Sequence, residues 1–487
     1  MAPGFTDIVE EARLSARALL DYGEGFFNPT VRLGVTGLSR AGKTVFITAL
    51  IHGLTRGGRF PVFEAYASGR IARARLEPQP DDAVPRFDYE NHVRTLIEER
   101  RWPSSTVDIS ELRLVIDYQR QNGADRTLTI DIVDYPGEWL LDLPLLTKSY
   151  EQWSAESLAL SREGPRLKLA APWHAHLATL SAEGKENEQA ALTAAKLFTD
   201  YLRACRDDRF AMSLLPPGRF LMPGNMAGTP ALTFAPLDVA ADGAAPDGSL
   251  WAMMKRRYEA YKDVVVRPFF RDHFARLDRQ IVLVDALSAF NAGPEALHDL
   301  EAALSGILDC FRIGRSTLLS NLFRPRIDRI LFAATKADHL HHQSHDRLEA
   351  VLRRAVASAA GRAEVAGAAI DVVALSAVRA TREAVVTRGR DKLPSILGTP
   401  APGEIANGET FDGETEVATF PGDLPDNPED LFNGGFRGLS STASDKADFR
   451  FLRFRPPLLE HAAAEEPSLP HIRLDRALQF LIGDRLQ

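Results

Sequence analysis

Eight consecutive residues near the amino terminus constrain the fold more than any other part of the chain. Residues 37–44 read Gly-Leu-Ser-Arg-Ala-Gly-Lys-Thr, which is the spacing of a phosphate-binding P-loop. The β-branched run 31–37 ends at this loop and the apolar stretch 45–54 follows it, which predicts a strand, a loop and a helix in that order. We therefore expect an α/β fold of the P-loop NTPase class, built on a doubly wound, mostly parallel sheet.

The residue types in this loop suit the binding of phosphate groups. Two glycines let successive backbone amides point inward, and the positive end of the following helix adds to the attraction for anions. Lys43 supplies an ammonium group to the β- and γ-phosphates, and the Thr44 hydroxyl is a ligand for the Mg²⁺ that bridges them. The predicted nucleotide-binding residues of the loop are Gly37, Ser39, Arg40, Ala41, Gly42, Lys43 and Thr44.

A predicted antiparallel hairpin leads to a second motif. The runs 109–118 and 126–133 flank turn residues, and Asp134 and Gly137 follow the second run. At this place the carboxylate can hold Mg²⁺ through water, and the glycine amide can contact the γ-phosphate. Loop, hairpin and aspartate come in the order found in Ras-like GTPases.

Several residues of the two predicted switch segments bear on hydrolysis. Glu138 stands where Ras-like GTPases commonly have a glutamine that positions the attacking water. A carboxylate can also orient water, but its negative charge near the γ-phosphate slows hydrolysis unless a cation such as Arg40 offsets it. The predicted catalytic residues are thus Lys43, Glu138 and Arg40. The threonine of the first switch that joins Mg²⁺ is expected at Thr106, with Thr95 as the alternative.

Two further segments predict recognition of guanine. Thr335, Lys336 and Asp338 follow an apolar run, and the aspartate can accept two hydrogen bonds from guanine N1 and N2, a donor pair that adenine lacks. Threonine replaces the usual asparagine, and the lysine stem can lie along the base. The tripeptide that would contact guanine O6 through a backbone amide follows the next apolar run and consists of Ser376, Ala377 and Val378.

The chain of 487 residues exceeds what one hydrophobic core usually organises. Apolar periodicity and proline content predict a large helical insertion inside the α/β domain, an enlarged loop at 56–108 and a loop-rich segment near the end. The expected division is an amphipathic helix in 1–30, a first GTPase part at 31–138, the helical insertion at 139–279, a second GTPase part at 280–380, the loop-rich segment at 381–469 and a terminal helix at 470–487.

Composition excludes several classes of protein. The net charge of −8 argues against nucleic acid as a partner, and the two cysteines, far apart in the sequence, argue against a disulfide framework or a zinc site. No apolar run reaches the roughly 20 residues that a membrane span requires. We therefore expect a cytoplasmic protein.

Two other features carry less functional weight. Four histidines crowd together at positions 339, 341, 342 and 345, directly after Asp338. A histidine cluster can bind metal, but capping a helix or lining a loop is our interpretation of it. Asp285 ends an apolar run at the expected carboxyl edge of the sheet, and we favour a structural role for it.

With these motifs in place, the whole chain resembles the YcjX-like family of bacterial P-loop proteins. The most telling stretches are 34–44, 131–144 and 335–339. The resemblance implies a Ras-like GTP-binding domain with enlarged switch regions, an extra helical part and an association with envelope stress. It also implies a protein effector of unknown identity, and a peripheral position at the inner membrane is the alternative to a purely cytoplasmic one.

The leading functional hypothesis is a regulatory switch that binds GTP or GDP with Mg²⁺ and hydrolyses GTP slowly. Two alternatives stay open. One is a nucleotide-bound scaffold without significant hydrolysis, which Glu138 favours. The other is an ATP-dependent phosphotransferase, which would share the phosphate-binding loop but needs an acceptor site that no motif indicates.

Overall fold

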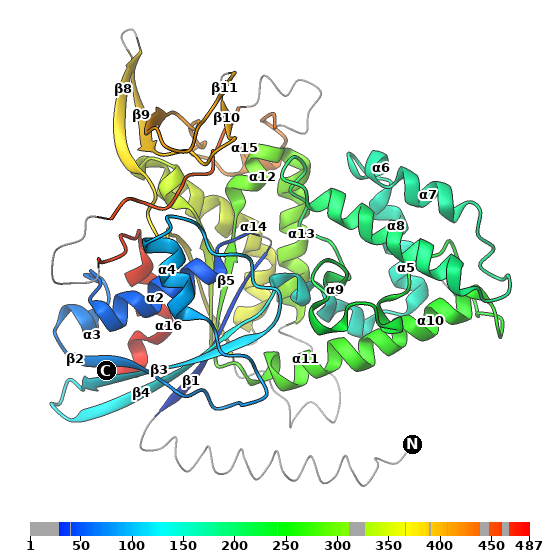
Figure 1. Cartoon of the computed structure of the whole chain (residues 1–487), viewed down its shortest axis with the longest axis horizontal. Helices are drawn as coiled ribbons and strands as arrows, with labels where there is room; N and C mark the ends of the chain where they lie inside the picture. The colour runs from blue at the N-terminus through cyan, green and yellow to red at the C-terminus, as the bar shows by residue number, and fades with distance from the viewer. Residues whose placement is uncertain are drawn as a thin grey trace.

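A seven-stranded sheet forms the centre of the molecule in the computed structural model, which describes residues 29–38, 40–240, 242–310, 327–365, 367–388, 391–406, 408–438, 448–459 and 467–487 (Figure 1). The strand order is β2-β3-β4-β1-β5-β6-β7. The strands are β1 (Thr30–Gly37), β2 (Ile71–Glu77), β3 (Ser110–Gln119), β4 (Asp125–Asp134), β5 (Arg279–Val284), β6 (Arg329–Ala334) and β7 (Ala369–Ala374). The amphipathic helix expected within 1–30 lies outside the described residues.

The sheet is mixed, as the sequence predicted. β1 pairs in parallel with β4 on one side and with β5 on the other, and β6 and β7 continue the parallel part. β3 and β4 form the predicted antiparallel hairpin, in a register that joins Ser110 to Asp134. All six residues of β5 are buried, which explains the apolar run 281–284 at its carboxyl end. The expected mostly parallel α/β sheet with a hairpin is therefore confirmed.

Helices cover both faces of this sheet because successive side chains of each strand point to opposite sides. Ile281 and Leu283 of β5 pack into one core with α2 (Lys43–Arg56) and α16 (Leu474–Ile482). The alternate residues Val282 and Val284 pack into a second core with three other helices. Those helices are α12 (Ala286–Ala292), α13 (Pro294–Cys310) and α14 (His345–Val365).

A helical region extends to one side of the sheet in Figure 1. Its longer helices are α5 (Tyr150–Ser161), α8 (Glu188–Arg206) and α10 (Leu250–Tyr261), and the shorter ones are α6 (Arg166–Leu169), α7 (Ala171–Leu177), α9 (Gly218–Leu221) and α11 (Arg267–Asp272). A 3-10 segment, η1 (Gly137–Thr147), connects the region to β4. Buried aromatic side chains such as Trp153, Trp173 and Tyr258 fill its interior. This interior is continuous with the core under β5, so the region packs against the sheet as part of one apolar cluster.

Two segments that we expected to be loops contain regular structure. Residues 56–108 hold β2, α3 (Glu64–Ala67) and α4 (Tyr89–Ile97), and β2 pairs with β3 at the edge of the sheet. The prolines that suggested a loop, at 61, 78, 80, 85 and 103, all lie outside these three elements. They mark the ends of short elements, as proline commonly does.

The second such segment is 381–469, where β8 (Arg382–Arg388), β9 (Asp391–Gly398) and β12 (Val417–Thr419) form a small antiparallel sheet. The same segment also contains the strands β10 (Ile405–Ala406) and β11 (Glu409–Thr410) and the short helix α15 (Glu429–Phe432). Pro394 of β9 is paired with Val385 of β8, and β12 does not extend as far as this residue. On the β12 side, the proline therefore removes no hydrogen bond of the sheet. Of the helices in the described part of the chain, none combines the length and apolar character that crossing a bilayer requires.

Candidate nucleotide-binding site

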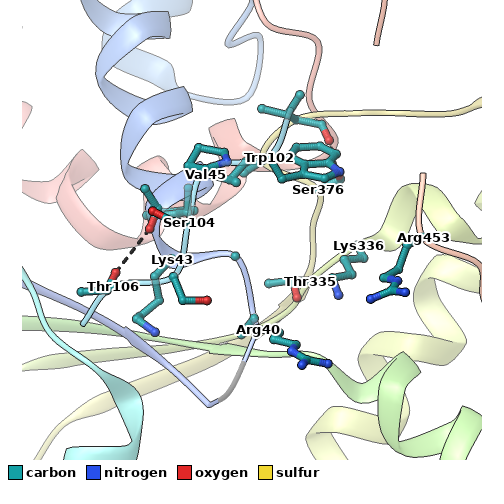
Figure 2. Close-up of a pocket in the computed structure, with 18 of the residues that line it drawn as sticks. Arg40, Lys43, Val45, Trp102, Ser104, Thr106, Thr335, Lys336, Ser376 and Arg453 are labelled. Atoms are coloured by element: carbon teal, nitrogen blue, oxygen red, sulfur yellow. Dashed lines mark hydrogen bonds between the residues drawn. The ribbon is translucent and has the colours of Figure 1, made fainter. Parts of the chain in front are cut away.

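The fold brings the predicted motifs to one cavity of about 420 Å³ at the carboxyl edge of the sheet (Figure 2). β1, β6 and β7 are parallel, so the segments that follow them emerge at the same edge. The predicted site residues that line the cavity are Arg40, Ala41, Gly42, Lys43, Thr44, Thr106, Glu138, Thr335, Lys336, Asp338, Ser376, Ala377 and Val378. Ser39 lies outside the described residues, and Gly37, Asp134 and Gly137 are not among the residues that line the cavity.

The predicted phosphate-binding loop has the backbone that an anion site needs. Gly42 has a φ of 83°, in the left-handed region that glycine occupies without strain, and it precedes the first residue of α2. Gly42, the N-cap residue, has no side chain to accept a hydrogen bond from the first turn of α2, and that turn contains no acidic residue. Lys43 is buried, and its Nζ donates to the carbonyl oxygen of Gly37 at 3.3 Å. The free amides of the first turn and one ammonium group therefore face the cavity.

Gly137 explains how the segment after β4 reaches this loop. A Cβ at Gly137 would lie 1.9 Å from the Gly37 carbonyl oxygen, so any other residue would clash with the backbone of the loop. Gly37 is equally constrained, because its own Cβ would lie 2.7 Å from the Leu283 carbonyl oxygen in β5. Absence of side chains at both positions thus allows direct contact between the two predicted phosphate-sensing segments.

The three residues predicted to bind Mg²⁺ meet in the structure. The Thr106 hydroxyl donates to Asp134 Oδ2 at 2.8 Å and lies 3.3 Å from the Thr44 hydroxyl (the dashed line at Thr106 in Figure 2). Asp134 Oδ1 is buried and has no hydrogen-bond partner among the described residues. Two hydroxyls and a carboxylate with a spare oxygen are hard oxygen donors, so this donor set fits Mg²⁺. The alternative residue Thr95 instead donates to the Asn91 carbonyl within α4.

Burial shifts the pKa of the Asp134 carboxyl group. It raises the pKa of Asp134 to about 6, although Lys43 and the Thr106 hydroxyl favour the charged form. The carboxylate is therefore destabilised in the folded, metal-free protein at neutral pH. A dication next to Oδ1 would reverse this effect, because it favours the charged form.

The variant Asp134→Asn tests this linkage. Because the folded-state pKa is raised from 3.8, the wild type loses stability as the pH rises from about 4 to above 6, by about 3 kcal/mol. We expect the metal-free variant to melt at a higher temperature than the wild type at pH 7.5, and the difference to vanish near pH 4. Thermal melts in EDTA measure this difference in melting temperature. A difference that is constant with pH would contradict the raised pKa of Asp134.

The surroundings of Glu138 differ from those expected. Its carboxylate is buried and lies 3.8 Å from Arg206, at the end of α8 in the helical region. The Glu138 backbone is held as well, because Gly218 packs on its carbonyl oxygen so closely that a Cβ would lie 1.9 Å away. Arg40, which we expected to offset the Glu138 charge, forms an ion pair with Asp208 instead. The offsetting cation is Arg206, a residue that no local sequence pattern distinguishes from the other arginines of α8.

Several cationic side chains lie around the cavity. Figure 2 shows Arg40, Lys336 and Arg453 directed toward a common space. Burial lowers the pKa of Arg40, and the neighbouring cations Arg453 and Arg206 lower it further. Asp208 contacts both Arg40 and Arg453, at 3.4 Å from the latter. Arg453 also pairs with Glu404 and Lys336 pairs with Asp285, so carboxylates balance these cations in the ligand-free site.

The side of the cavity that would hold the base is organised by Lys336 and Asp285. Lys336 has a φ of 60° and precedes a 3-10 turn, and its Nζ pairs with Asp285 Oδ2. Asp285 also caps α12 by accepting from the Ser288 amide at 3.2 Å. Burial opposes ionisation of Asp285, but Lys336 outweighs it and the pKa is lowered. These contacts agree with the structural role that we favoured for Asp285.

Asp338 is held by the chain that follows β7. Its Oδ2 accepts from the Ala380 amide at 2.8 Å, and its carbonyl oxygen accepts from the Thr381 hydroxyl. Ser376 exchanges backbone hydrogen bonds with Ile472, and its hydroxyl donates to the Val378 carbonyl oxygen at 3.0 Å. The carboxyl-terminal segment before α16 therefore fixes the tripeptide 376–378 beside Asp338.

Several lining residues come from segments in which the sequence indicated no ligand contact. Arg206 and Met222 come from the helical region, and Arg453 and Phe454 come from the segment that we expected to be loops. Phe454 closes the cavity together with Trp102, whose indole Nε1 donates to the Phe454 carbonyl oxygen at 2.6 Å. In the sequence, the one indication of this wall of the cavity is Trp102, a tryptophan within a polar segment.

The sequence is similar to those of known proteins over almost its whole length. Residues 31–486 match the model of the YcjX-like family, DUF463. A protein of Escherichia coli named "Ras-like GTPase YcjX" is 36% identical over 483 residues, which cover 94% of this chain and 96% of the relative. A protein of the same name from Shewanella oneidensis is 34% identical over 487 residues, covering 94% and 95%.

Proposed function

Because this chain belongs to the YcjX-like family, we propose that it binds a guanine nucleotide with Mg²⁺ in the cavity and hydrolyses GTP slowly. The relatives named Ras-like GTPase support the nucleotide class. The observation that carries the proposal is the convergence of an anion-binding loop, an oxygen donor set and a base-reading carboxylate on one cavity. These are the parts that binding of a nucleoside triphosphate requires.

Each group has a defined task in this proposal. The amides of the loop and Lys43 hold the β- and γ-phosphates, and Thr44, Thr106 and Asp134 would hold Mg²⁺, which neutralises phosphate charge when bound. Asp338 would accept hydrogen bonds from guanine N1 and N2. Glu138 would orient the attacking water as a hydrogen-bond acceptor.

Arg206 makes the acidic residue at position 138 compatible with a triphosphate. The Glu138 carboxylate alone would repel the γ-phosphate, whereas the paired guanidinium, 3.8 Å away, cancels much of its charge. The cation comes from the helical region, so this region takes part in binding of the terminal phosphate. Slow hydrolysis is expected because this pair adds no net positive charge to that which Lys43 and Mg²⁺ would supply to the transition state.

Loss of Arg206 should therefore lower the affinity for GTP more than that for GDP. An unpaired carboxylate near the γ-phosphate costs about 1–2 kcal/mol, so Arg206→Ala is expected to reduce the GTP-to-GDP affinity ratio about tenfold. Adding Glu138→Gln should restore the ratio. Titration calorimetry with GDP and a non-hydrolysable GTP analogue measures it, with Arg203→Ala, an exposed arginine on the same helix, as the matched control. Equal losses for both nucleotides would contradict this role of Arg206.

The regulatory part of the proposal is that GTP orders the segments around Thr106 and Glu138, and that hydrolysis releases them. η1 begins at Gly137 and leads directly into the helical region, which also touches the phosphate-binding loop through Asp208 and Arg40. Hydrogen exchange of the helical region should therefore differ between the GDP and GTP-analogue states. Identical protection would remove the switch. Because the family resemblance implies an association with envelope stress, we include a role for this protein in the bacterial stress response in the proposal.

A second candidate function is a nucleotide-bound scaffold without significant hydrolysis. The Glu138–Arg206 pair favours it, because a carboxylate that already contacts a guanidinium is less available to accept a hydrogen bond from water. Single-turnover phosphate release separates the two. Release that is abolished by Glu138→Ala supports a working GTPase, and the absence of release from the wild type supports the scaffold.

A further inference from the structure

A group of potential metal ligands lies outside the cavity, beside the loop that carries Asp338. His341 and His342 follow that loop, and Glu383 is the second residue of β8. Each offers one ligand atom, and these three atoms lie within 4.8 Å of one another. The sequence shows the two histidines side by side, but only the fold adds the carboxylate.

We propose that His341, His342 and Glu383 bind a divalent transition-metal ion of the Zn²⁺ class. Two imidazoles and one carboxylate are ligands that such ions accept, whereas Mg²⁺ prefers oxygen donors alone. The three ligand atoms lie within 4.8 Å of one another, close to the separation of ligands around one ion. Three protein ligands leave a further coordination position for water.

The side chains are arranged in a way that favours binding. His342 Nδ1 lies 2.9 Å from Glu383 Oε2, and the rings of His341 and His342 are 4.2 Å apart. A competing cation, Arg379, lies 3.9 Å from Glu383 at the surface, where an ion pair is weak.

The position of this group suggests what the ion would do. Asp338 is held by Ala380 and Thr381, immediately before β8, while His341 and His342 follow Asp338 itself. An ion between the histidines and Glu383 would therefore tie together the two segments that position the base-reading carboxylate. This consequence rests on the proposed guanine binding, whereas the metal site itself does not.

The test is a titration of full-length protein, first stripped with EDTA and desalted, with Zn²⁺ in excess Mg²⁺. Excess Mg²⁺ occupies the oxygen donor set at Asp134. We expect one tight site in the wild type, and at least a tenfold loss of Zn²⁺ affinity in both His342→Ala and Glu383→Gln. Both residues are exposed, and circular dichroism checks that the variants fold. Co²⁺ in place of Zn²⁺ should give a visible absorption band that the variants lack.

The chain offers a matched control in His298, an exposed histidine on α13 that lies 3.9 Å from Glu301 without a third ligand nearby in the described structure. His298→Ala should bind Zn²⁺ like the wild type. Absence of a tight site in the wild type, or unchanged affinity in both site variants, would overturn the proposal. These titrations contain no nucleotide, so their failure is distinct from a failure to bind GTP.

The link to the base is tested separately. GDP affinity in excess Mg²⁺ should rise severalfold on addition of one equivalent of Zn²⁺, and this rise should be absent in His342→Ala. An unchanged GDP affinity in the wild type would overturn the coupling between the ion and Asp338.

Discussion

Replacement of Lys43 by alanine is expected to weaken the binding of GTP by about 100-fold. The Lys43 ammonium is buried at the mouth of the phosphate-binding loop, where its acceptor in the protein is the Gly37 carbonyl oxygen at 3.3 Å. Charge-assisted hydrogen bonds to a phosphate contribute about 1.5–3 kcal/mol each, and about 1.4 kcal/mol corresponds to a tenfold change in affinity. Loss of one strong contact in a site shielded from water therefore accounts for a change of this size.

Fluorescence titration with a labelled GTP analogue measures this effect. Lys196→Ala is the matched control, because this substitution removes the same charge far from the cavity. Lys196 is exposed on α8 and pairs with Asp200. The control should bind GTP as the wild type does. Equal affinities of Lys43→Ala and the wild type would show that the nucleotide does not bind at this loop.

The second large effect is expected from Asp338→Asn, which should lower GTP affinity about 100-fold and create a preference for xanthine nucleotides. The carboxylate is expected to accept two hydrogen bonds from guanine, together worth about 3 kcal/mol or more. An asparagine amide donates where guanine also donates, but it complements the carbonyl group of xanthine. The asparagine carbonyl oxygen can still accept from the Ala380 amide, so the loop should keep its conformation.

Competition among GTP, XTP and ATP measures the change in specificity. Asp346→Asn is the control, because Asp346 is exposed on α14 and pairs with Arg473. Retained GTP affinity in Asp338→Asn would remove the guanine assignment. Tighter binding of ATP than of GTP by the wild type would favour the phosphotransferase alternative.

The central sheet was predictable because its elements carry strong local signals. The apolar runs in β5 and β6 are what strands covered on both faces require, and turn residues mark the hairpin of β3 and β4. β2 was missed although its sequence, Ile-Ala-Arg-Ala-Arg-Leu-Glu, alternates. The prolines that surround it suggested a loop, and an edge strand with partly exposed residues gives only a weak pattern.

The candidate site was predictable to the extent that it consists of contiguous motifs. The phosphate-binding loop, Asp134, Asp338 and the tripeptide 376–378 each follow a strand, and the topology of a parallel sheet brings such segments to one edge. Single residues from distant segments were not predictable. Arg206 ends an amphipathic helix whose sequence shows only a solvent face with several basic residues, and its approach to Glu138 depends on how the helical region packs.

The same limit applies to Arg40. Its place within the loop suggested a cation for Glu138, but its guanidinium pairs with Asp208 instead. Which arginine accompanies the carboxylate therefore depends on contacts between segments that are distant in the sequence. The histidines after Asp338 show a similar dependence, because the third potential ligand is supplied by a strand that the sequence did not reveal.

Displacement of a fluorescent GDP analogue from the purified protein in magnesium buffer tests the central claim most directly. We predict that the analogue binds, that unlabelled GTP displaces it, and that ATP at a hundredfold excess over GTP does not. Failure of the protein to bind the analogue, or equal displacement by ATP, would contradict the proposal that the cavity is a guanine-nucleotide site.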